Sequence, residues 1–289
     1  MIQPRGPRER FTLLFDEEAH LPPHLPAPFR QIYQGDWRPL DVPDRPYTFV
    51  NFVTARDGRV SFAEPGHASG ADISGFSAPD RWVMGLLRAG ADAVMMGEGT
   101  LHAEPDQLWT SDFIFPDDAE AFADLRRHLG LSALPLNVFV SLNGELNPAA
   151  AVFCQPNQHV VVATTERGRA QAEARLRGCA ARLDVLALGD TAADLDALVR
   201  TLHERYGVRA LLCEGGPRVY GAMLQAGLVD EEFLTLSPLM VGEAPGTPRP
   251  SLVECAAFAP GHAPRSTLIS LRRVGDHLFL RSRWIGNTR

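Results

Sequence analysis

From residue 47 onward, short apolar runs alternate with longer stretches in which apolar residues recur about every three or four positions. The apolar runs predict strands at 47–54, 92–96, 136–141, 159–163, 183–188 and 210–213. The longer stretches predict helices at 78–89, 118–129, 167–177, 193–206 and 217–226. Because strands and helices alternate, the pattern predicts right-handed crossovers and a largely parallel sheet flanked by helices.

The two ends of the chain break this alternation. Residues 1–45 carry prolines that interrupt any long element, so we expect an extension with short pieces of structure, packed on the domain or on a partner subunit. Residues 46–289 then form the main domain. Near the C-terminus, "STLISLRRV" and "HLFLRSRW" flank Gly275 and Asp276 and predict an antiparallel hairpin. The expected fold is therefore α/β, with a mostly parallel central sheet and antiparallel strands at one edge.

Composition narrows the chemistry more than the fold. The chain has 289 residues and a formal net charge of −7, which argues against a dedicated nucleic-acid binder. All 28 basic residues are arginine, so there is no Schiff-base lysine, no pyridoxal-phosphate anchor and no P-loop lysine. The four cysteines form no C-x-x-C pair, which disfavours a zinc site. Without a signal-peptide pattern or an apolar run long enough for a bilayer, we expect a cytoplasmic protein with no membrane partner.

The first candidate site residues follow the strand predicted at 92–96. The chain there reads Gly97-Glu98-Gly99-Thr100, and glycines at the end of a parallel strand let the backbone approach a ligand. A tight turn is the alternative explanation, because His102 stands where the dinucleotide fingerprint has its third glycine. The adjoining "HAEP" is found in zinc nucleobase deaminases, but the P-C-x-x-C that they also need is absent. A solvated loop therefore explains "HAEP" adequately.

A second pair of glycines lies where strand 210–213 meets the next helix. Gly215 and Gly216 precede that helix, whose N-terminal N–H groups and dipole suit a phosphate. Glu214, directly before them, either faces a hydroxyl or ring N–H of a ligand or forms a structural ion pair with an arginine. Asp57, in the turn "TARDGRV", lies at the same predicted edge. This edge is therefore predicted to bind a nucleotide-like ligand and a second molecule.

Three segments together resemble a known family. They read "RPYTFVNFVTARDGRV", "ISGFSAPDRWVMGLLRAGADAVMMGEGT" and "LLCEGGPRVYGAMLQAGLVDEEFLTLSPLMVG". They are similar to the signature blocks of riboflavin-biosynthesis reductases, the reductase domain of the bifunctional deaminase–reductase. The resemblance implies a dihydrofolate-reductase-like fold, NADPH as the cofactor and a homodimer. It also implies reduction of the ribosyl group of a phosphoribosylamino-pyrimidine to a ribityl chain.

The same resemblance implies roles for individual residues. Cofactor contacts are implied at Gly97, Gly99, Thr100, Ser141, Thr164, Gly215 and Gly216. Ser141 would lie near the 2′-phosphate of the adenosine ribose. Asn51, Asp57 and Glu214 would line the pocket for the substrate and the nicotinamide. As a separate hypothesis, Asp57 or Glu214 relays a proton as the catalytic residue, directly or through water, and no metal is expected.

The sequence departs from the family pattern on the substrate side. Ala55 and Arg56 stand where the family usually has a small hydroxyl residue and a leucine, and "QLWTSDFIFP" is an insert. Reduction of another small substrate, such as a pterin or a carbonyl compound, is therefore an alternative function. A non-catalytic nucleotide-binding protein is another. Glu214 favours an enzyme, because a carboxylate is awkward to keep in a purely structural loop.

Overall fold

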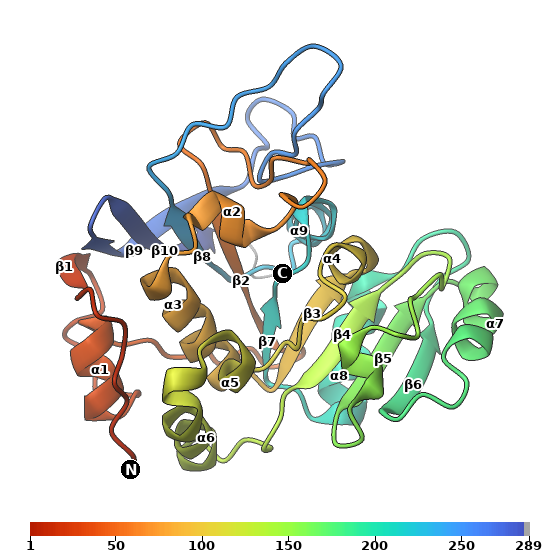
Figure 1. The fold of residues 1–289 in the computed structure, drawn as a ribbon, viewed down its shortest axis with the longest axis horizontal. Coiled ribbons are helices and arrows are strands. Elements are labelled where there is room, and N and C mark those ends of the chain that lie inside the picture. Colours follow the sequence, from red (N-terminus) through yellow and green to blue (C-terminus); the bar gives the residue numbers. More distant parts are fainter. Residues whose placement is uncertain (286–289) are drawn as a thin grey trace.

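The computed structural model describes residues 1–285 as one 10-stranded sheet covered by helices (Figure 1). The strands, in their order across the sheet, are β1 (Thr12–Asp16), β9 (Arg265–Val274), β10 (His277–Ile285), β8 (Glu231–Leu236), β2 (Tyr47–Thr54), β7 (Ala210–Cys213), β3 (Ala93–Gly97), β4 (Leu136–Val140), β5 (His159–Thr164) and β6 (Arg182–Ala187). From β8 to β6 the neighbours are parallel, whereas β10, β9 and β1 continue the sheet in antiparallel pairs. The predicted mostly parallel sheet with an antiparallel C-terminal hairpin is confirmed.

Helices pack against both faces of this sheet. They are α1 (Ala27–Tyr33), α2 (Gly70–Ser74), α3 (Ala78–Ala89), α4 (Glu98–Ala103), α5 (Ser111–Ile114), α6 (Ala119–His128), α7 (Glu166–Arg175), α8 (Leu195–Tyr206) and α9 (Pro217–Gln225), with 3-10 turns at Pro116–Asp118 and Ala151–Cys154. One core contains Trp82 of α3 and Phe122 of α6. A second core contains Leu202 of α8 and Tyr220 of α9. The parallel strands are therefore buried on both faces, as their nearly continuous apolar sequences require.

Local sequence explains where the helices begin and end. The Ser77 side chain caps α3 by accepting a hydrogen bond from the Asp80 N–H at 3.4 Å. The Thr165 hydroxyl accepts one from the Gly168 N–H at the start of α7. Helix α8 ends at Gly207, whose φ of 67° is a left-handed conformation that suits glycine. Every strand and helix predicted from the sequence is present, with ends shifted by a residue or two.

Strand β8 joins the parallel and antiparallel halves of the sheet, and the hydrophobic pattern does not predict it. It begins with Glu231 and Glu232, and two adjacent carboxylates do not resemble a buried strand. Glu231 nevertheless is 0% exposed and pairs with Arg281 and Arg283. Glu232 accepts a hydrogen bond from the Tyr220 hydroxyl, and burial raises the pKa of Glu232. The Glu231 charge is compensated by arginines 50 and 52 positions away in the sequence, which periodicity does not reveal.

Residues 1–45 pack on the domain of their own chain. Strand β1 extends the sheet by pairing with β9. Phe11, Phe29 and Trp37 lie in the same core as α3, and the ring of Phe11 lies 5.1 Å from that of Phe279. Of the two placements expected from the sequence, the structure shows the one on the domain.

Candidate functional site

The predicted site residues follow strands that are neighbours in the sheet. β2, β7, β3 and β4 are adjacent and parallel, so the loops after them meet at one carboxyl edge. The loops after β7 and β3 approach each other closely, because a Cβ added at Gly216 would lie 3.7 Å from the Thr100 hydroxyl oxygen. The structure thus brings Gly97, Thr100, Gly215 and Gly216 together.

Close packing explains two of these glycines. A Cβ at Gly97 would lie 3.0 Å from Val219 Cγ2, and one at Gly215 would lie 2.7 Å from Val219 Cγ1. At Gly99, by contrast, a Cβ would have nothing within 4 Å, so the position faces open space. The segment that the sequence predicts as a loop is the start of α4, with Gly97 as its N-cap. The packing of Val219 therefore requires Gly97 and Gly215, whereas at Gly99 and Gly216 the loops present backbone that a ligand can approach.

Helix α9 begins at the same point and supplies hydrogen-bond donors. Its N-cap is Gly216, which has no side chain to occupy the first turn. The N–H groups of Gly216 and Arg218 donate to no acceptor within residues 1–285. The helix has 9 residues, and its dipole gives these N–H groups partial positive charge. Free backbone donors beside bare glycine backbone fit the pyrophosphate of a dinucleotide.

Glu214 continues β7 on the face covered by α3. Its N–H donates to the Met95 carbonyl at 2.9 Å, which extends the ladder between β7 and β3. Its carboxylate accepts hydrogen bonds from Arg88 of α3, with Nη2 2.8 Å from Oε2. The side chains are 1% exposed for Arg88 and 6% for Glu214. The ion pair that the sequence left open as an alternative is therefore present, and it fixes the orientation of the carboxylate.

Asn51 lies beside Glu214. The register of β2 and β7 pairs Val50 with Cys213, so the next residues along these parallel strands are Asn51 and Glu214. Asn51 is 9% exposed, and its carboxamide makes no hydrogen bond to another described residue. A largely buried amide without a protein partner is available to a ligand.

Asp57 contacts the loop that follows β8. Its carboxylate accepts hydrogen bonds from the N–H groups of Val241 at 3.3 Å and Gly242 at 2.6 Å. Desolvation works in the opposite direction, but these hydrogen bonds and the nearby Arg59 lower the pKa of Asp57. An ionised carboxylate that accepts backbone hydrogen bonds is suited to joining two loops.

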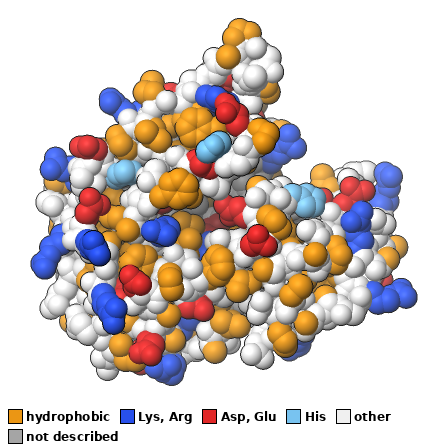
Figure 2. Space-filling model, in the orientation of Figure 1, with side chains coloured by type: hydrophobic (Ala, Val, Ile, Leu, Met, Phe, Trp, Pro, Cys, Tyr) orange, Lys and Arg blue, Asp and Glu red, His pale blue; other side chains and the backbone are white. Residues whose placement is uncertain are grey.

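The turn at Asp57 belongs to a lobe of loops above the carboxyl edge, formed by residues 55–69 and 237–264 (Figure 1). A salt bridge of 2.5 Å between Arg59 and Glu243 joins its two halves. Figure 2 shows this face of the molecule hollowed between the lobe and the helices below, with acidic side chains at the hollow. The lobe therefore forms one wall of the candidate site.

Further charged residues surround Glu214, and no motif in the sequence points to them. Asp80 of α3 is buried, and desolvation raises its pKa from 3.8 to about 6. Burial also raises the pKa of Glu104, Arg88 opposes this rise, and Glu214 adds to it. Carboxyl groups therefore outnumber cations around Arg88. In the sequence these residues belong to a helix start, an amphipathic helix and a loop, so no local signal marks them as members of one site.

Ser141 and Thr164 end neighbouring strands but differ in accessibility. The Ser141 hydroxyl donates to the Glu98 carboxylate and accepts a hydrogen bond from the Gly144 N–H at 2.9 Å. Thr164 is 0% exposed, and its Oγ1 would lie 2.1 Å from a Cβ placed on Gly168. The Thr164 hydroxyl thus lies beneath the first turn of α7. A cofactor contact by this side chain does not fit the structure.

Two other hollows lie away from the carboxyl edge. One of about 20 Å³, lined by Asp16 and Arg281 among others, lies beneath the N-terminal segment. The other, of about 620 Å³, lies at the opposite edge, near Asp92, Leu136 and His159. Ligands of open parallel sheets bind at the carboxyl ends of the strands, so neither hollow is the candidate site.

Across residues 1–285, no group of three metal-ligating side chains forms a metal site, and no helix is long and apolar enough to cross a membrane.

Comparison with known sequences is consistent with this geometry. The family model described as RibD C-terminal domain matches residues 46–279. The chain is 26% identical over 240 residues to a 2,5-diamino-6-ribosylamino-4(3H)-pyrimidinone 5′-phosphate reductase of Archaeoglobus fulgidus, covering 83% of this chain and 99% of that protein. It is 24% identical over 241 residues to the riboflavin biosynthesis protein RibD of Escherichia coli, covering 81% of this chain and 59% of that protein.

Solved structures share the fold. A pyrimidine reductase-like protein from Corynebacterium diphtheriae matches with a TM-score of 0.64 and 21% identity, over 84% of this chain and 93% of that chain. Acinetobacter baumannii RibD matches with a TM-score of 0.62 and 22% identity, over 84% of this chain and 59% of that chain. Because the matched family segment covers most of its length, the chain belongs to the RibD C-terminal domain family.

Proposed function

We propose that this protein reduces a phosphoribosylamino-pyrimidine of riboflavin biosynthesis and converts its ribosyl group to a ribityl chain. Family membership and the names of the curated relatives support a pyrimidinone phosphate reductase. The observation in this chain that carries the proposal is the position of Asn51 and Glu214 beside the glycine loops. The homodimer implied by the resemblance and the cytoplasmic location expected from the sequence belong to the same proposal.

A reduced nicotinamide dinucleotide is the cofactor in this proposal, and when bound it supplies the hydride. The backbone at Gly97, Gly99 and Thr100 would border it. The free N–H groups of Gly216 and Arg218 would hold its pyrophosphate. The family resemblance implies the phosphorylated form, NADPH.

In this proposal the side chains at the carboxyl edge bind the substrate and supply a proton. Reduction of the ribosyl group adds a hydride to C1′ and a proton to the ring oxygen that is released. Glu214, oriented by Arg88, and the free carboxamide of Asn51 would bind polar groups of the substrate. Glu104, whose pKa is raised by burial, would be the carboxyl group that supplies the proton. Asp57 would hold the lobe in place.

Other substrates are an alternative because Ala55 and Arg56 depart from the family pattern. Ala55 is 0% exposed and packs with Ile73 and Val241, so its side chain does not line the hollow. The missing hydroxyl therefore removes no group from the candidate pocket. Arg56 is exposed and would change only the rim of the site.

Turnover by the purified protein tests the proposal directly. The 2,5-diamino-pyrimidinone and the 5-amino-uracil forms of the substrate phosphate are offered with NADH and with NADPH, beside a pterin and a carbonyl panel. Oxidation of the cofactor with a pyrimidine phosphate supports the proposal. Turnover of a pterin or carbonyl compound alone would assign another substrate, and cofactor binding without any turnover would indicate a non-catalytic protein.

Replacing Glu214 tests its place at the reacting end. We expect Glu214→Gln to lower kcat on the order of 10²-fold while changing the dissociation constant of the cofactor little, because the carboxylate acts on the substrate. Steady-state kinetics and a cofactor titration measure the two quantities. Equal loss of both would remove this role from Glu214.

A second variant guards against a folding defect, because Glu214→Gln leaves buried Arg88 without its charged partner. Asn51→Leu keeps the ion pair and removes only the free carboxamide. We expect it to raise KM for the pyrimidine phosphate about tenfold, with cofactor binding unchanged. An unchanged KM would show that Asn51 does not contact the substrate.

A further inference from the structure

The order of the strands sets the path of the dinucleotide across the carboxyl edge. The substrate residue Asn51 lies in β2, and the pyrophosphate donors follow β7, whose other neighbour is β3. The adenosine end must then extend away from β2, over the ends of β4 and β5, which are the next strands in the sheet. Neighbouring strands are about 4.8 Å apart, so an extended dinucleotide spans several of them.

Glu98 lies where this path passes from β3 to β4. Its carboxylate accepts a hydrogen bond from the hydroxyl of Ser141 at the end of β4. The Ser141 hydroxyl also accepts the Gly144 N–H at 2.9 Å, so its proton and a lone pair are both in use within the protein. Ser141 therefore has no proton to donate to a phosphate unless its bond to Glu98 breaks.

The Glu98 carboxylate retains the capacity to accept further hydrogen bonds. Its side chain is 23% exposed, and its Oε1 lies 4.0 Å from His102 Nδ1, beyond hydrogen-bond range. The other ring nitrogen of His102 lies 3.1 Å from the Glu145 carbonyl oxygen. No arginine among the described residues forms a salt bridge with Glu98. A carboxylate without an arginine partner among the described residues therefore lies at the region assigned to the adenosine ribose.

Such a carboxylate favours one form of the cofactor. It can accept hydrogen bonds from the ribose hydroxyls of NADH, the role of the acidic residue in other NAD sites. The 2′-phosphate of NADPH would bring two negative charges to the same place, where like charges repel. We propose that Glu98 selects NADH over NADPH in this chain, in contrast to the form that the family resemblance implies. This inference rests on the proposed function, since it assumes a nicotinamide dinucleotide at this edge.

Equilibrium titrations of the purified protein with NADH and NADPH test the inference without catalysis. We expect NADH to bind roughly tenfold or more tightly, because one charged contact at close range has about this effect. Glu98→Gln keeps the shape and one acceptor but removes the charge. It should tighten NADPH binding about tenfold and change NADH binding less than about threefold.

Glu145→Gln is the matched control, because Glu145 is an exposed carboxylate near the same loops whose side chain makes no hydrogen bond to another described residue. It should leave the ratio of the two affinities unchanged. Tighter binding of NADPH by the unmodified protein, or an unchanged ratio in Glu98→Gln, would overturn the inference. Failure of the proposed function has a different signature: no turnover of the pyrimidine phosphates with either dinucleotide, whichever one binds more tightly.

Discussion

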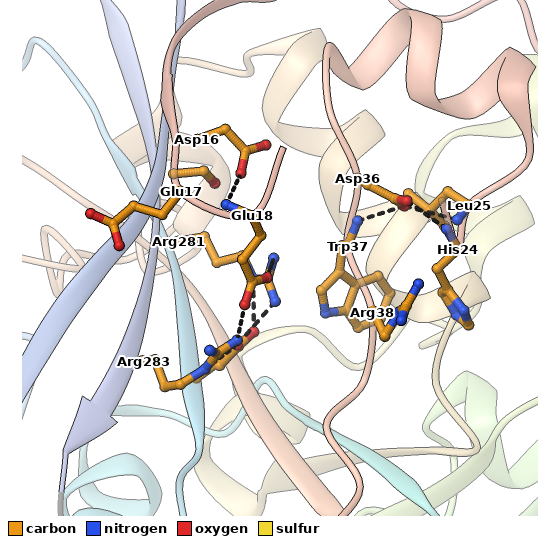
Figure 3. A network of polar contacts seen from close by, with 12 residues as sticks. Asp16, Glu17, Glu18, His24, Leu25, Asp36, Trp37, Arg38, Arg281 and Arg283 are labelled. Atoms are coloured by element: carbon orange, nitrogen blue, oxygen red, sulfur yellow. Dashed lines mark hydrogen bonds and ion pairs between the residues drawn. The ribbon is translucent and has the colours of Figure 1, made fainter. Parts of the chain in front are cut away.

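Two groups of buried charged residues in this molecule are built differently. The edge network joins β8 and β10 to the N-terminal segment, and Figure 3 shows Glu18 between Arg281 and Arg283. Its members are Glu18, Tyr47, Glu231, Arg281 and Arg283. The site cluster lies between α3 and the end of β7, and its members are Asp80, Arg88, Glu104 and Glu214. The network pairs each carboxylate with arginine, whereas carboxyl groups outnumber arginine in the cluster.

This difference indicates that the edge network stabilises the fold, whereas the site cluster takes part in the chemistry. Glu231 receives hydrogen bonds from Arg281 Nε at 2.8 Å, Arg283 Nη2 at 2.6 Å and the Tyr47 hydroxyl at 2.6 Å. Because every charge in it is paired, the network has a structural role and holds β8, β10 and the N-terminal segment together. In the site cluster, burial raises the pKa of Asp80 and Glu104; Thr235 and His277 offset this rise only in part at Asp80, and Arg88 only in part at Glu104. Raised pKa values beside a candidate pocket are characteristic of functional sites.

Breaking the edge network should give the largest effect. We expect Glu231→Gln to lower the free energy of unfolding by about 3–5 kcal/mol, because it leaves two arginines in the network without their buried partner. Chemical denaturation measures the loss. The kcat of the folded fraction should stay the same, since Tyr47 and Glu231 begin β2 and β8, at the end of the parallel strands opposite the candidate site.

Glu18→Gln is the matched control within the same network. Glu18 is 21% exposed and contacts the same two arginines, so its loss should cost only about 1 kcal/mol. If the two variants were equally stable, burial of Glu231 would not be what makes the network strong. A fall in kcat for the folded Glu231→Gln protein would contradict the separation of the two groups.

Neutralising Asp80 should give the next largest effect, with the opposite sign. Its pKa of about 6 in the folded protein lies above the ordinary 3.8, so the folded state binds the proton more tightly. This stabilises the fold below about pH 4 and is lost as the pH rises through 6. The loss amounts to roughly 3 kcal/mol. Asp80→Asn should therefore be more stable than the unmodified protein at pH 7.5.

Thermal unfolding of both proteins across this pH range measures the difference. Other carboxyl groups titrate in both, so the difference between the two curves isolates Asp80. A constant difference from pH 4 to 7.5 would show that Asp80 carries no raised pKa. The site cluster would then be as well compensated as the edge network.

The sequence predicts the parallel half of the molecule better than the antiparallel edge. Strands such as β7 are uninterrupted apolar runs, and periodicity identifies them directly. Periodicity does not predict strand β8, because Glu231 is paired with arginines far along the chain and Glu232 is buried against the Tyr220 hydroxyl. The same kind of long-range pairing hides the packing of residues 1–45, which depends on contacts such as that of Phe11 with Phe279.

The candidate site shows the same division. The glycines and Glu214 are recognisable from local sequence, and the topology places them at one edge. The orientation of Glu214 depends on Arg88, which lies 126 positions away, and no local pattern indicates that pair. Thr164 ends a strand like Ser141, yet its hydroxyl lies beneath α7, which strand spacing alone does not reveal.

Replacing Asp57 should have the smallest effect on stability. Asp57 shares a feature with each group, because it is ionised like the carboxylates of the edge network but lies at the candidate site. Asp57→Asn keeps one acceptor for the N–H groups of Val241 and Gly242 and removes the charge. We expect a loss of about 1 kcal/mol in unfolding free energy, with faster hydrogen exchange at those two amides. Asp44→Asn, at an exposed carboxylate without a side-chain hydrogen bond to another described residue, should change neither.

Because the lowered pKa keeps Asp57 ionised, the lobe should loosen as the pH falls below about 4 in the unmodified protein but not in Asp57→Asn. A drop in kcat at neutral pH far larger than the change in exchange would instead assign Asp57 to the chemistry, and the structural role would then belong to the edge network alone.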